Sequence, residues 1–155
     1  MKEEMTYEEY HALTLQAVDE YNNDDYRQAL EKFSRLEKAN FNNRKIHEVL
    51  CYIYLNLGDF RQAQKQYDIY LKLAAEENPH LRLPRSFSEV ITECGDMKET
   101  ETEYTQIMKT EPADSSSVDF EIPIKLCLLY INKGDYKKAE EIISGFKNRF
   151  YPHKS

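Results

Sequence analysis

The chain has 155 residues, of which 41% are hydrophobic and 32% charged, and its formal net charge is −7. This acidic balance argues against a general nucleic-acid binder, which needs a basic face, and against electrostatic docking on an anionic membrane. No apolar run approaches the ~20 residues that span a bilayer, and the polar start MKEEMTYEEY lacks the pattern of a secretory leader. We therefore expect one cytoplasmic domain, residues 1–155, with its three cysteines reduced.

The first predicted helix begins after Thr6, because Thr6 and Glu9 have the spacing of a capping box. It leads to the phrase NDDYRQAL at 23–30, which returns as LGDFRQAQ at 57–64, CGDMKETE at 94–101 and KGDYKKAEE at 133–141. The anchor residues of the four copies, spaced by 34, 37 and 39 residues, are Tyr26, Phe60, Met97 and Tyr136. A period of this size is typical of repeat architectures.

The repeated phrase predicts a helix end followed at once by a helix start. Glycine readily takes the left-handed conformation that ends a helix, which here concerns Gly58, Gly95 and Gly134. The next residue can cap the following helix, a role expected for Asp25, Asp59, Asp96 and Asp135. In the first copy Asp24 stands in place of the glycine, and Asp tolerates the same conformation less well.

Helical periodicity continues on both sides of each phrase. Tyr26, Ala29 and Phe33 lie on one stripe after the first copy, and Leu50, Ile53 and Leu57 lie on one stripe before the second. No convincing strand pattern occurs. The sequence therefore predicts an all-α fold in which each copy is a helix, a tight turn and a second helix.

Helix–turn–helix units of 34 residues that carry Gly-Asp-aromatic-x-x-Ala resemble the tetratricopeptide repeat family. The resemblance gives four repeats in a single domain, at approximately 10–43, 44–77, 81–114 and 120–153. The third is degenerate, since Thr100 replaces the small residue found as Ala29, Ala63 and Ala139 in the others. No motif identifies the branch of the family. The resemblance implies a right-handed α-solenoid whose first helices line a concave groove.

That groove is where the resemblance places a peptide or partner protein. Its positions fall on His11, Val18, Tyr21, Asn22, Lys45, Glu48, Tyr52, Asn56, Arg82, Arg85, Glu89, Leu128 and Asn132. The three asparagines recur at one repeat position. They suit hydrogen bonding to an extended peptide, and they equally suit the end of a helix.

The last predicted helix raises a separate possibility. It keeps an apolar stripe with no further helix to cover it, formed by Ile142, Phe146, Phe150 and Tyr151. If exposed, a stripe of this size indicates an interface, either of a homodimer or with a larger assembly.

Residue constellations for catalysis are not recognisable in the sequence. The four histidines and three cysteines show no HExxH or CxxC spacing, and neither GxGxxG nor a P-loop occurs. We therefore expect no enzyme, no metal and no cofactor. The expected function is an adaptor or scaffold that binds a peptide or protein. The alternatives are a chaperone of the class II type III secretion kind and a peptide-sensing regulatory module.

Overall fold

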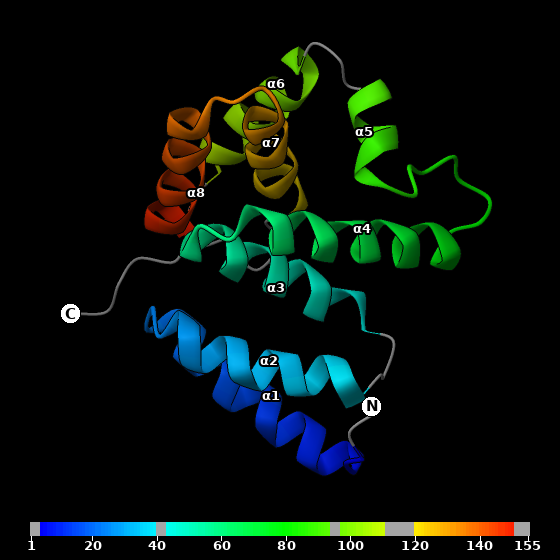
Figure 1. The fold of residues 1–155 in the computed structure, drawn as a ribbon, viewed down its shortest axis with the longest axis vertical. Helices are drawn as coiled ribbons and strands as arrows, with labels where there is room; N and C mark the ends of the chain where they lie inside the picture. Colours follow the sequence, from blue (N-terminus) through cyan, green and yellow to red (C-terminus); the bar gives the residue numbers. More distant parts are fainter. Residues whose placement is uncertain (1–3, 40–42, 94–96, 111–119, 151–155) are drawn as a thin grey trace.

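The computed structural model describes residues 4–39, 43–93, 97–110 and 120–150. Within these ranges the secondary structure is entirely helical, which confirms the all-α prediction there (Figure 1). The helices are α1 (Tyr7–Asn22), α2 (Tyr26–Ala39), α3 (Arg44–Leu57), α4 (Phe60–Glu77), α5 (Phe87–Glu93), α6 (Lys98–Met108), α7 (Glu121–Asn132) and α8 (Tyr136–Phe150). None of them is both long enough and apolar enough to cross a bilayer.

The repeated phrase forms the same turn wherever the structure describes it. Asp24, Gly58 and Gly134 are left-handed, with φ of 63°, 79° and 82°. The following aspartate N–H donates to a carbonyl five residues back, at 2.9 Å in all three copies: Asp25 to Glu20, Asp59 to Tyr54 and Asp135 to Tyr130. These bonds satisfy carbonyls that a helix end leaves unpaired. Gly95 and Asp96 lie outside the described residues.

Two of the predicted aspartate caps, Asp59 and Asp135, and the predicted capping box start their helices. The Asp59 carboxylate accepts a hydrogen bond from the Gln62 N–H at 3.3 Å, and Asp135 accepts one from Lys138 at 3.1 Å. At α1 both bonds of the capping box between Thr6 and Glu9 are present. Short-range chemistry therefore sets the helix boundaries at these points.

Three tight hairpins follow from these turns: α1 with α2, α3 with α4, and α7 with α8. At the start of each second helix a small residue is buried against the first helix, at Ala29, Ala63 and Ala139. A larger side chain there would hold the two helices apart. The α2–α3 contact then joins the first hairpin to the second.

The third predicted repeat differs from the other three. Its first helix, α5, spans only Phe87–Glu93, and α5 packs on α4 while α6 packs on α7. The two helices therefore pack mainly on the neighbouring repeats and not on each other. Thr100 is buried where the other repeats have alanine, and its hydroxyl has no hydrogen-bond partner among the described residues. An unpaired buried hydroxyl makes this the least favourable of the small-residue positions.

The C-terminal hairpin lies against the second hairpin, because α7 and α8 both contact α3 and α7 also contacts α4 (Figure 1). An aromatic cluster fills the junction and consists of Tyr21, Tyr52, Phe120, Phe146 and Phe150. Its neighbouring ring centroids are 5.1 to 6.1 Å apart. These distances and tilted or edge-to-face geometries are the favourable ones for aromatic pairs.

Candidate functional site

The middle of the expected groove is filled by the protein's own C-terminal helix. Tyr52 is fully buried, and its hydroxyl donates a hydrogen bond to the Ile143 carbonyl of α8 at 3.2 Å. Tyr21, Glu48 and Leu128 are buried as well. The expectation that these four groove residues would face open solvent is therefore wrong. The cause is the position of α7 and α8 against α3, which periodicity along the chain does not encode.

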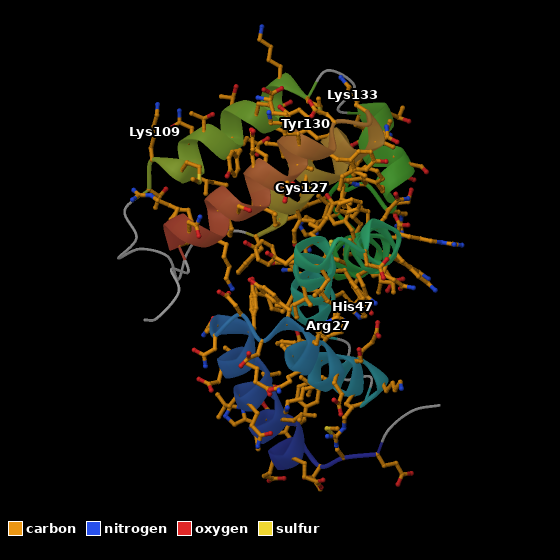
Figure 2. All side chains as sticks on the ribbon, turned by 60° about the vertical axis from the view of Figure 1, so that its left-hand side comes forward. Arg27, His47, Lys109, Cys127, Tyr130 and Lys133 are labelled. Carbon is orange, nitrogen blue, oxygen red and sulfur yellow. The ribbon has the colours of Figure 1, made fainter. Side chains whose placement is uncertain are left out.

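Lys147 joins α8 to the end of the first hairpin. Its ammonium group lies 2.9 Å from the Asp24 carboxylate and donates to the Tyr21 carbonyl at 3.1 Å. The same group lies 4.2 Å from the centre of the Tyr21 ring and 4.8 Å from that of Tyr26. Burial lowers the pKa of Lys147, and the Asp24 carboxylate partly opposes that shift. Figure 2 shows side chains that project into the space between the first hairpin and the C-terminal helices.

The apolar stripe expected on the surface of the last helix is largely internal. Phe146 and Phe150 are buried in the aromatic cluster, and Ile142 is half-buried. The condition for an oligomer interface there, exposure of the stripe, is therefore not met at Phe146, which lies against the Tyr52 and Phe120 rings, or at Phe150, which lies against Phe146. Tyr151 lies outside the described residues.

The other expected groove residues fall into two groups. Asn22 and Asn56 are half-buried, whereas the exposed ones are His11, Val18, Lys45, Arg82, Arg85, Glu89 and Asn132. The Asn56 amide donates to the Tyr52 carbonyl of its own helix at 2.9 Å, which favours the helix-end interpretation at this position. Arg82, Arg85 and Glu89 lie at or near α5, far from α1 (Figure 1).

One apolar face remains uncovered on α1. Tyr7 is 71% exposed, Leu15 60% and Val18 40%. Together with the exposed His11 they have the spacing i, i+4, i+8, i+11, which places them within about 80° of the helix circumference. We call Tyr7, His11, Leu15 and Val18 the α1 stripe. The core-facing side of α1 carries Tyr10, Leu13, Ala17 and Tyr21 and is centred about 110° around the helix from the stripe.

The groove positions included His11 and Val18 but missed Tyr7 and Leu15. The regular spacing of residues 7, 11, 15 and 18 in the sequence already indicates that all four lie on one face of the helix. Leu15 corresponds in repeat position to Val49, which is partly buried against the core, so periodicity alone does not mark it as exposed. Its exposure follows from the place of α1 at one end of the molecule (Figure 1).

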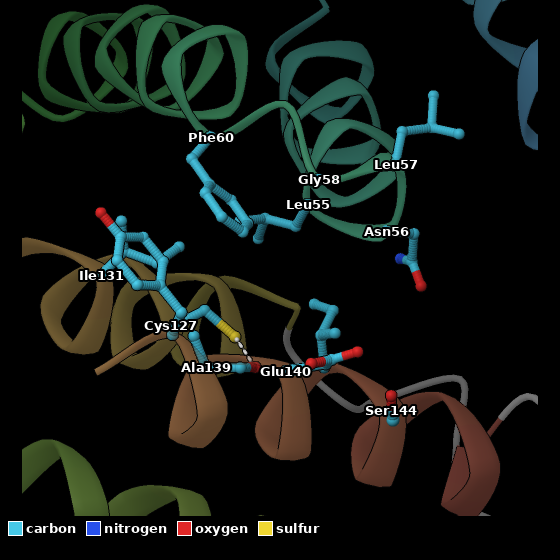
Figure 3. Close-up of a pocket in the computed structure, with 12 residues that line it drawn as sticks. Leu55, Asn56, Leu57, Gly58, Phe60, Cys127, Ile131, Ala139, Glu140 and Ser144 are labelled. Carbon is cyan, nitrogen blue, oxygen red and sulfur yellow. Dashed lines mark hydrogen bonds between the residues drawn. The ribbon is translucent and has the colours of Figure 1, made fainter. Parts of the chain in front are cut away.

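A cavity of about 320 Å³ lies between the α3–α4 turn and the C-terminal hairpin (Figure 3). The Phe60 and Tyr136 rings stack at its wall, 5.6 Å apart. The Cys127 thiol donates to the Ala139 carbonyl at 3.3 Å, and burial raises the pKa of this thiol. Among the described residues that line it, Glu140 is the one carboxylate. These lining residues therefore include neither an activated nucleophile nor a pair of acid and base groups.

A second group of titratable side chains joins α2, α3 and α4. The His47 imidazole lies 2.8 Å from the Gln66 amide oxygen and 3.4 Å from the Glu37 carboxylate (Figure 2 labels His47). The Gln66 amide N–H donates to Glu37 at 3.0 Å. Burial lowers the pKa of His47, but the hydrogen bonds to Glu37 and Gln66 outweigh burial and raise it. Within the described ranges no group of His, Cys, Asp and Glu is placed to hold a metal ion.

No family model matches the chain, and no curated protein and no solved structure matches it. The likeness to tetratricopeptide repeats thus rests on the residues of this chain alone.

Proposed function

We propose that the chain is a tetratricopeptide-type array whose C-terminal hairpin packs back on the second hairpin, and that it acts without chemistry of its own as a protein-interaction module. Its partner, a peptide or a protein segment, binds at the α1 stripe. Three tight hairpins with the same turn geometry support the architecture. The exposure of the α1 stripe is the observation that carries the binding site.

The stripe is unusual for its concentration of apolar surface. The described residues expose five large apolar side chains, and three of them, Tyr7, Leu15 and Val18, share one face of one helix. Single exposed apolar residues are ordinary, whereas apolar groups gathered on one face mark interaction surfaces. A partner that buries this face removes it from water, which favours association by about 25 cal/mol per Å² of apolar surface.

The C-terminal hairpin determines which part of the first helices a partner can reach. Because α8 covers Tyr52 and Tyr21, a segment cannot lie along α3 without displacing it. The N-terminal part of α1 needs no such displacement. The proposed site is thus the uncovered end of the face that the repeats would line together.

The test compares partners captured from native lysate by the full chain and two variants. Leu15→Gln with Val18→Gln removes apolar surface from the stripe. Leu81→Gln with Tyr136→Gln removes exposed apolar groups elsewhere, since Leu81 is 50% and Tyr136 55% exposed. We expect quantitative mass spectrometry to find a partner retained by the chain and the control but reduced at least about tenfold by the stripe variant. Equal recovery by the stripe variant would contradict the proposed site.

A further inference from the structure

The charges on α1 are all of one sign. Tyr7–Asn22 contains Glu8, Glu9, Asp19 and Glu20 and no lysine or arginine. Glu9 belongs to the capping box, and Glu20 pairs with Lys32 at 2.7 Å. Glu8 and Asp19 are exposed, and among the described residues no basic group pairs with either.

These two carboxylates border the stripe. At 100° per residue, Glu8 projects within about 20° of Leu15 and Asp19 within about 40°, on the edge away from the core. The uncovered face is therefore an apolar strip with one carboxylate near each end of its outer edge. A helix laid on it would bury its own apolar side chains and place its flanking residues beside Glu8 and Asp19.

The adjacent part of the same molecule is already covered by a helix of that kind. Where α8 meets the end of α1, Phe146 packs edge-to-face on Tyr52, and the next residue, Lys147, pairs with Asp24 and lies over Tyr21. An apolar side chain of α8 and the cationic side chain that follows it thus cover the surface next to the α1 stripe. The α1 stripe continues this covered region toward the N-terminus of α1.

We propose that the α1 stripe binds a basic amphipathic helix of a partner protein. This inference rests on the proposed function and names the chemistry of the partner. The apolar face of the partner helix covers Tyr7, Leu15 and Val18, and its lysines or arginines lie against Glu8 and Asp19. A second copy of this chain fits poorly, because pairing two α1 stripes sets carboxylates against carboxylates. An anionic lipid surface is repelled for the same reason.

The test uses two synthetic helices of the length of α1, identical in their leucine positions. One carries lysine at the flanking positions and the other glutamate. Each is labelled and titrated with the full chain, with binding followed by fluorescence anisotropy. We expect the Leu/Lys helix to bind at least about tenfold more tightly than the Leu/Glu helix, and raising salt from about 50 to about 300 mM to narrow that difference.

Matched variants distinguish specific contact of the Leu/Lys helix with the α1 stripe from its general electrostatic attraction to an acidic protein. Glu8→Gln with Asp19→Asn should weaken binding of the Leu/Lys helix about three- to tenfold. Glu99→Gln with Glu103→Gln removes two exposed carboxylates of α6 and should change affinity less than about twofold. Binding of the Leu/Lys helix to the unaltered chain should shift the amide resonances of α1 in chemical-shift mapping. This measurement does not depend on any variant.

Three results would overturn the inference: equal binding of the two helices, equal weakening by the α6 control, or shifts centred away from α1. A dimer in sedimentation that Leu15→Gln with Val18→Gln disperses would also overturn it, since the stripe would then cover itself. If a captured partner depends on the stripe but the Leu/Lys helix does not bind, the charge inference fails and the proposed function stands. If no captured partner depends on the stripe, the proposed function itself fails.

Discussion

Truncation of Phe146 tests whether the C-terminal hairpin covers the first helices. Phe146 is fully buried, and its ring centroid lies 5.1 Å from Phe150, 5.4 Å from Phe120 and 6.1 Å from Tyr52. Replacing a core phenylalanine by alanine costs about 3–5 kcal/mol, because apolar burial is lost and a cavity remains. Domains are typically stable by about 5–15 kcal/mol, so Phe146→Ala should remove a large share of the free energy of unfolding.

Urea denaturation followed by circular dichroism measures this change. With a slope of about 2 kcal/mol per M, the midpoint should fall by about 2 M. The chain has no tryptophan, so the near-ultraviolet signal of its tyrosines reports on the aromatic cluster. Tyr7→Ala is the matched control, because Tyr7 is 71% exposed and its loss should cost under about 0.5 kcal/mol. If Phe146→Ala is no more destabilising than Tyr7→Ala, α8 does not pack as described.

Three further changes probe other contacts. Tyr52→Phe keeps the ring but removes the hydroxyl that donates to Ile143 at 3.2 Å, and should cost about 1 kcal/mol in urea denaturation; an unchanged midpoint would argue against that bond. Ala63→Leu overpacks a fully buried hairpin contact and should lower the free energy of unfolding by about 1–3 kcal/mol. The control Gln64→Leu, at an exposed neighbouring position, should change it by under about 0.5 kcal/mol. The pKa of His47 is raised above its ordinary 6.5, so its stabilising contribution is complete below pH 6.5 and is lost as pH rises through the folded-state pKa. The stability advantage of the unaltered chain over His47→Gln should therefore shrink between about pH 5.5 and about pH 8.5, and an advantage independent of pH would contradict this.

Local structure could be predicted from the sequence because short-range rules govern it. The left-handed residue at Gly58 and Gly134 and the caps at Asp59 and Asp135 depend on atoms within a few residues. Even the substitute Asp24 takes the expected conformation, with φ of 63°. Turn chemistry and hydrophobic period therefore determined the all-helical class and the helix boundaries at these turns, whereas the short α5 of the third repeat was not predicted.

The candidate site could be predicted only in part. His11 and Val18 were placed on it by repeat position, whereas Tyr7 and Leu15 were not. The apolar stripe of the last helix was recognised, but its burial was not, because the rings that pack on Phe146 from outside its own helix are Tyr52 of the second hairpin and Phe120. Which apolar surface stays exposed depends on contacts between residues far apart in the chain.

Val18 and Tyr52 show which properties the sequence determines and which depend on the tertiary structure, since they hold the same repeat position in successive first helices. The sequence by itself determined that both project from the same face of their helices, because the helical period fixes that direction. Only the tertiary structure decided that Tyr52 is fully buried while Val18 is 40% exposed. The physical reason is that α8 packs on α3 and reaches just the end of α1, a long-range contact that no local pattern specifies.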